Sequence, residues 1–216
     1  MRLCSGLLVL ALLLVGRSSP VEAAAIEGRV ALPSDNAAPM VRPRYPVAAT
    51  YTVGEPDPPT AIVYLEGDFG PAHRSAAPAA DVTQRGYQFA PGLVAVRRGS
   101  VVRFPNLDEE YHSVFSYSKT RRFDLGRYQR DETPPTLKFE QAGVVRLFCE
   151  IHEHMRGTIL VLDTPYFTRT DTEGRYRLDG LPPGRFTVKA WLDEDTVRVQ
   201  TVELRDGPPA RADFPE

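Results

Sequence analysis

The side chains of this chain that could do chemistry gather in residues 148–157. Cys149 is followed three residues later by His152, and His152 three residues later by Met155. Thiolate, imidazole and thioether together suit copper, above all a site with two His, one Cys and a weak axial Met. A second histidine must come from elsewhere in the chain. His112 is the candidate, so the sequence predicts a metal site of His112, Cys149, His152 and Met155.

Two of these assignments have alternatives within the same loop. His154 also lies at a tolerable spacing from Cys149, but choosing His152 leaves Met155 at the spacing expected of the axial ligand. We therefore expect His154 to lie near the surface beside the metal. Met155 could instead be a core side chain with no ligand role. His73 lies in a polar stretch without other ligand types and is interpreted as a solvated loop residue.

The beginning of the chain has the pattern of a secretory signal peptide. Arg2 precedes an uninterrupted apolar run, 7–15, and Ala23 ends a small-x-small cleavage pattern. Nine apolar residues are too few to span a bilayer, and no later segment is long enough either. The sequence thus predicts a signal peptide at 1–23, no membrane span, and a periplasmic protein.

Export makes the cysteine count informative. Removal of 1–23 would take away Cys4 and leave Cys149 alone, so no disulfide could form within the chain. Coordination to a metal would explain a lone thiol in an oxidising compartment. The alternative is an inert buried cysteine, which His152 and Met155 as neighbours disfavour.

The charge balance limits the classes of partner. A net charge of −2 argues against nucleic acid and gives no support for binding to a membrane surface. The basic and aromatic stretch 119–130 could dock an acidic redox partner, or could simply be a solvated loop. The run 108–110, Asp-Glu-Glu, is interpreted as a turn first and an acidic patch second.

The chain has the composition of an all-β protein. Its 20 prolines and 16 glycines are scattered as turn residues, and β-branched and aromatic residues recur in short runs between them. No long segment has a 3.6-residue period. Strands are predicted at 26–32 and 61–67, on both sides of an Arg-Gly turn within 88–106, from 114–115 onward, at 137–139, 144–148 and 158–162, after a turn within 168–178, and at 186–191 and 197–204.

The segment 81–163 resembles the cupredoxins, the small blue-copper electron carriers. The resemblance to amicyanin-like and plastocyanin-like members lies in Phe89-x-Pro91, Gly99, Phe104-x-Asn106, His112 and the loop 149–157. The short gap between His152 and Met155 is typical of amicyanin. A Greek-key β-sandwich and one type 1 copper per chain are implied. One departure is Ser113, where these carriers commonly have Asn; this puts the usual link between the two ligand loops in question.

The chain ends resemble a second family, the carboxypeptidase regulatory-like (transthyretin-like) β-sandwiches. The resemblance lies in the pattern of 170–188 and in the Ile-x-Gly-x-Val form of 26–30. We therefore expect 24–70 and 164–216 to form one smaller, discontinuous sandwich with the cupredoxin inserted in it. This arrangement is similar to proteins labelled methylamine-utilisation or plastocyanin-like.

The function implied by the resemblance is single-electron transfer between redox partners. A periplasmic copper-binding or chaperone module is the alternative, and it would use the same residues. A copper enzyme is disfavoured, because only four histidines are present and two are assigned to one site. No catalytic residues are predicted. Apolar Phe115, Phe148 and Ile151, with the backbone near Ser113, are expected to tune the site.

Overall fold

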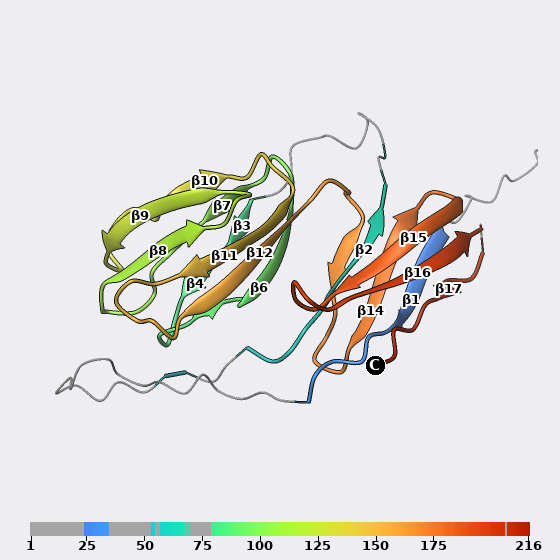
Figure 1. Ribbon diagram of the computed structural model, residues 1–216, viewed down its shortest axis with the longest axis horizontal. Helices are drawn as coiled ribbons and strands as arrows, with labels where there is room; N and C mark the ends of the chain where they lie inside the picture. The colour runs from blue at the N-terminus through green and yellow to red at the C-terminus, as the bar shows by residue number, and fades with distance from the viewer. Residues whose placement is uncertain (1–23, 35–52, 55–56, 68, 70–78, 206) are drawn as a thin grey trace, which may run out of the picture.

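The computed structural model describes the chain except for residues 1–23, 35–52, 55–56, 68, 70–78 and 206. The predicted signal peptide and His73 lie outside the described residues. The described residues contain 17 strands and no helix, which confirms the all-β prediction. Figure 1 shows two β-sandwiches side by side. No helix in the described ranges could cross a membrane.

The first unit, here called the central sandwich, spans 80–162. Its strands are β3 (Ala80–Asp81), β4 (Thr83–Gln84), β5 (Phe89–Ala90), β6 (Leu93–Arg97), β7 (Val101–Arg103), β8 (His112–Tyr117), β9 (Arg122–Tyr128), β10 (Thr136–Lys138), β11 (Gly143–Phe148) and β12 (Arg156–Leu162). Five of them form a sheet in the order β6-β12-β11-β8-β9, with β10-β7-β3 and β4-β5 as smaller sheets. Alternate residues of facing strands, such as Val102, Val114 and Leu147, build one core that also contains Cys149 and Met155.

Several short strands, such as β3 and β4, were not predicted, and neither was the longer strand β9. The charged stretch that the sequence favoured as a loop or docking segment contains β9, which lies at the edge of the five-stranded sheet. Phe123 and Leu125 pack against the core, while the alternating residues Arg122 and Asp124 are exposed. An edge strand with one solvated face carries many charges, so its composition is close to that of a loop.

The second unit, the terminal sandwich, combines both ends of the described chain. Its strands are β1 (Ala24–Arg29), β2 (Ile62–Glu66), β13 (Phe167–Arg169), β14 (Arg175–Leu181), β15 (Gly184–Trp191), β16 (Val197–Leu204) and β17 (Ala210–Arg211). They form the sheets β14-β1-β17 and β13-β2-β15-β16. Among the described residues, strands β1 and β2 therefore pair with strands that follow 164, and one core joins them. That these strands constitute a separate domain stays a prediction.

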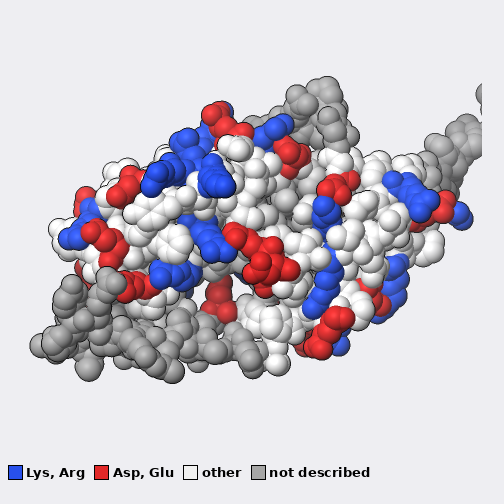
Figure 2. Space-filling view, in the orientation of Figure 1, with Lys and Arg blue, Asp and Glu red and all other residues white. Residues whose placement is uncertain are grey.

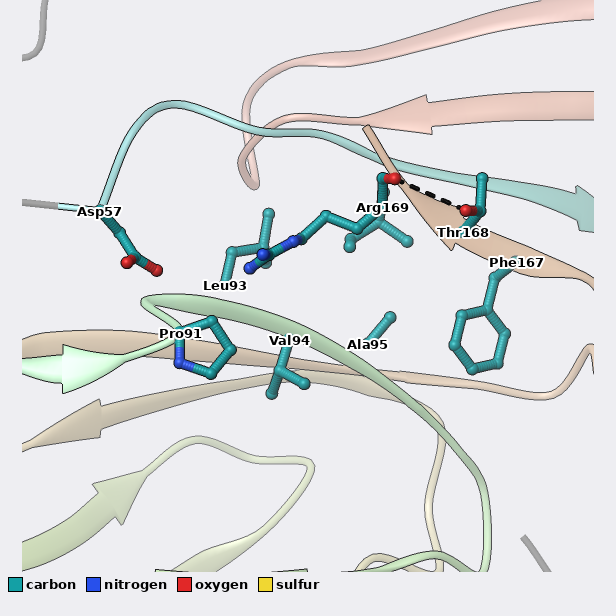
Figure 3. Close-up of a pocket in the computed structure, with 9 residues that line it drawn as sticks. Asp57, Pro91, Leu93, Val94, Ala95, Phe167, Thr168 and Arg169 are labelled. Carbon is teal, nitrogen blue, oxygen red and sulfur yellow. Dashed lines mark hydrogen bonds between the residues drawn. The ribbon is translucent and has the colours of Figure 1, made fainter. Parts of the chain in front are cut away.

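The two sandwiches contact each other through a small apolar interface. Leu160 and Leu162 on the outer face of β12 pack with Ile62 and Trp191 of the terminal sandwich. Beside this interface, residues from both units line a groove of about 470 Å³. Figure 3 shows Arg169 reaching over its apolar floor toward Asp57. Its lining contains no His or Cys, so the groove is separate from the residues predicted to bind metal.

Candidate metal centre

The strands of the central sandwich bring the predicted ligands together at one end of its core. His112 is the first residue of β8, Cys149 directly follows β11, and Met155 directly precedes β12. Because β11 lies between β8 and β12, the ends of all three strands meet. The loop between β11 and β12 is a tight turn in which Met155 N–H donates to the His152 carbonyl over 2.9 Å.

Three donor atoms converge in this place. The Cys149 sulfur lies 3.9 Å from His112 Nδ1 and 4.0 Å from His152 Nδ1, and the two nitrogens are 3.0 Å apart. Among the described residues, His112, Cys149 and His152 are the His, Cys, Asp or Glu side chains whose ligand atoms lie close enough together to hold a metal ion. All three residues are buried, with His112 wholly inaccessible.

The size of this triangle suits a transition metal. A point equidistant from the three atoms lies about 2.1 Å from each, close to the bond lengths of imidazole nitrogen and thiolate sulfur to such an ion. Met155 is 1% exposed and belongs to the same core cluster as Cys149. The residues present therefore fit a copper ion with a soft donor set.

Ser113 connects the two ligand segments. Its backbone N–H points at the Cys149 sulfur at 3.5 Å, and its side-chain oxygen accepts a hydrogen bond of 2.8 Å from the Glu150 N–H. The link that the missing Asn put in question is therefore present, with a hydroxyl as acceptor. Fixing the sulfur from the neighbouring strand limits its movement when the charge of the site changes.

The apolar surroundings of the sulfur differ from the prediction. Phe148 and Phe115 stack on each other with ring centroids 5.7 Å apart, but neither belongs to the core cluster that contains Cys149. The core cluster that contains Cys149 consists of buried residues such as Phe89, Val114 and Leu147. Side chains alternate along β8 and β11, so the residue before Cys149 lies on the outer face of the sheet. Ile151 is 40% exposed.

The site favours the thiolate form of Cys149. Burial alone would raise the pKa of this thiol, but hydrogen bonds from His112, His152 and backbone amides outweigh burial and lower the pKa to about 5. A thiolate at neutral pH is the form that binds metal. For His112 the effect of burial is the opposite, because burial lowers the pKa of an imidazole. Hydrogen bonds to Cys149 and Asp108 outweigh this effect, so the pKa of His112 is raised overall.

We expect the ultraviolet thiolate absorbance of the metal-free protein to disappear as the pH falls through about 5. Since the folded thiol has a lower pKa than the unfolded one, it stabilises the fold at high pH. This stabilisation is lost as the pH falls toward 5. A pH titration in the ultraviolet checks this, with Cys149→Ser as the blank. A midpoint close to 9.0, the ordinary value, would contradict it.

His154 lies beside the cluster without joining it. Its Nε2 is 3.0 Å from the Tyr87 carbonyl, and burial lowers its pKa. We expect His154→Ala to leave the copper spectrum nearly unchanged, because His154 is outside the group of three donors and its Nε2 is engaged with a carbonyl. Visible absorption of the copper-loaded variant checks this, with His152→Ala as the variant that should lose the band. Loss of copper from the His154 variant would show that the wrong histidine was chosen.

Asp108 is a residue of the site that sequence analysis missed. Its carboxylate oxygen Oδ2 lies 2.9 Å from His112 Nε2, on the opposite side of the imidazole ring from Cys149. The spacing of the two residues along the chain was visible, but nothing in the sequence shows that the acidic turn folds back onto the histidine.

Known proteins resemble this chain only in part. No protein-family model matches the chain, and no curated protein matches it. Copper-containing nitrite reductase (NirK) from Thermus scotoductus SA-01 is 21% identical and matches 40% of this chain and 23% of its own, with a TM-score of 0.38.

Two structures of amicyanin are similar over part of the chain as well. A methionine-to-alanine mutant in the Cu(I) form is 18% identical, over 46% of this chain and 98% of its own, with a TM-score of 0.36. An oxidised proline-to-glycine mutant is 22% identical, over 39% of this chain and 82% of its own, with a TM-score of 0.36. Each match covers less than half of this chain, so none assigns it an activity, and the carboxypeptidase regulatory-like resemblance stays a prediction.

Proposed function

We propose that this protein is a periplasmic blue-copper protein that binds one copper ion at His112, Cys149, His152 and Met155 and carries single electrons between redox partners. The observation that carries the proposal is the buried triangle of one sulfur and two imidazole nitrogens. Copper bound there would supply a one-electron couple, because the donor set suits both Cu(I) and Cu(II). The described residues contain one further histidine, His154, so they do not offer a second histidine-rich copper site.

The chain's own residues would keep rearrangement small during electron transfer. The donors face one another, and Ser113 and Asp108 contact two of them from outside the triangle. Burial keeps bulk water away from the sulfur. A site that is held in place in this way has a small reorganisation energy when its charge changes by one unit.

A strip of aromatic and basic side chains would form the docking surface for a redox partner. Phe148, which precedes Cys149, stacks on Phe115, and Phe115 contacts Tyr117, with ring centroids 5.2 Å apart. Tyr117 is 67% exposed. The guanidinium groups of Arg122 and Arg156 lie over the rings of Tyr117 and Phe148. Basic side chains gather over β9 and β10 in Figure 2, so an acidic partner would be complementary.

Redox cycling of the copper-loaded protein tests this function. A carrier should be reduced and reoxidised reversibly by one electron per chain, and should exchange electrons with an acidic redox protein more slowly at high salt. A copper chaperone is the alternative. It would bind Cu(I) tightly in competition with a chelator, without an intense visible band or reversible cycling. That second outcome would contradict the carrier proposal.

A further inference from the structure

Asp108 is built into the structure behind His112. Its side chain is 13% exposed, although it belongs to an Asp-Glu-Glu turn whose next member, Glu109, is 87% exposed. The carboxylate accepts hydrogen bonds from three places: Gly86 N–H at 2.7 Å, Tyr87 N–H at 3.0 Å and His112 Nε2 at 2.9 Å. A buried carboxylate needs such partners, and here one of them is a predicted metal ligand.

The turn at 86–87 is shaped to hold this carboxylate. Gly86 and Tyr87 both have positive φ angles, 60° and 59°, and both of their N–H groups donate to Asp108. The Tyr87 ring lies edge-on against His112 and His152, with centroids 5.8 and 4.9 Å apart. A non-glycine residue in the left-handed region is uncommon and is found where the surroundings require it. The same turn thus holds Asp108 and covers both imidazoles.

The orientation of the His112 ring depends on this contact. An ionised carboxylate only accepts hydrogen bonds, so the nitrogen that faces Asp108 must carry the proton. With a proton on Nε2 toward Asp108, the other ring nitrogen, Nδ1, faces Cys149 and His152. His112 is wholly buried, so solvent does not reach its Nε2 beside the carboxylate.

We propose that Asp108 is a positioning residue of the metal centre, which fixes His112 with its proton on Nε2 and lowers the reduction potential of the bound copper. The potential part rests on the proposed function. A negative charge in a water-poor site, one imidazole away from the metal, favours Cu(II) over Cu(I). The resemblance to cupredoxins implies the ligands, whereas the contact between Asp108 and His112 is seen in the structure of this chain.

The reduction potential of Asp108→Asn tests the charge, with Glu109→Gln as the matched control. Both variants remove one negative charge from the same turn, but only Asp108 contacts His112. We expect Asp108→Asn to shift the Cu(II)/Cu(I) equilibrium toward Cu(I) by about tenfold or more, which is about 59 mV for one electron. Glu109→Gln should shift it by less than about twofold, since solvent screens an exposed charge. Asp108→Glu, which keeps the charge, should stay closer to the wild type than Asp108→Asn. Equal shifts in the Asn and Gln variants would overturn the charge effect.

The protonation of His112 Nε2 in the metal-free wild-type protein tests the positioning role without copper. Nitrogen chemical shifts of the imidazole should show a proton on Nε2, the nitrogen that faces Asp108. An Nε2 without a proton would overturn the proposal even if Asp108→Asn does not fold. A wild-type protein with the expected proton on Nε2 but without a blue copper band would refute the proposed function and leave the positioning role standing.

Discussion

Cys149→Ser is expected to abolish the visible absorption band of the copper-loaded protein completely. The band of a blue-copper site arises from charge transfer between thiolate sulfur and Cu(II), and serine offers a hard oxygen that stays protonated. The site should also bind Cu(I) far more weakly, because the softest of its donors is gone. An absorption spectrum of the variant after copper addition measures the first effect.

Ser113→Ala is the matched control for this change. It removes a hydroxyl near the same sulfur, 3.9 Å away, but no donor atom of the triangle. Its band should persist with a shifted maximum, because the link to the Glu150 N–H is lost. Full band intensity in Cys149→Ser would refute the thiolate assignment, whatever the control shows.

Gly28→Ala is expected to destabilise the terminal sandwich by about 3 kcal/mol. A Cβ at Gly28 in β1 would come within 1.9 Å of the Ala212 carbonyl oxygen, a backbone atom that cannot give way as a side chain could. The chain following β17 continues parallel to β1 at this point, since Ala212 N–H donates to the Glu27 carbonyl over 3.0 Å. The substitution would therefore separate the beginning of the described chain from its end.

Two probes in the same protein follow the two sandwiches. Trp191 is the single tryptophan and lies in β15, so its fluorescence during denaturation reports on the terminal sandwich and its contact with β12. The copper band reports on the central one. Gly28→Ala should lower the fluorescence midpoint and keep the band under native conditions. Gly92→Ala, where a Cβ meets nothing nearer than 3.8 Å, is the control. An unchanged fluorescence midpoint in Gly28→Ala would contradict the shared terminal sandwich.

The arrangement of the ligand residues could be predicted because it depends on short-range patterns. Cys149, His152 and Met155 lie on one loop between two apolar runs, and a loop between neighbouring antiparallel strands has few possible shapes. His112 is the first residue of β8, so it lies close to Cys149 once β8 pairs with β11. The pairing of β1 with strands after residue 164 followed from a family pattern, not from local sequence.

The parts that could not be predicted depend on contacts between distant segments. Asp108 meets the 86–87 turn across some 20 residues, and nothing in an acidic turn shows which carboxylate will be buried. Ser113 replaces the usual Asn, and only the structure shows that its oxygen reaches the Glu150 N–H. The sequence indicated that Phe115 and Phe148 lie near the sulfur, but which face of the sheet they occupy follows from the register of β8 against β11.

The most direct test of the central claim is a titration of the metal-free wild-type protein with Cu(II), followed by visible absorption. The convergence of His112, Cys149 and His152 predicts an intense thiolate-to-copper band that grows with each addition and saturates at one copper per chain. A protein that takes up copper without this band, or that takes up none, would contradict the assignment of a blue-copper centre to these residues.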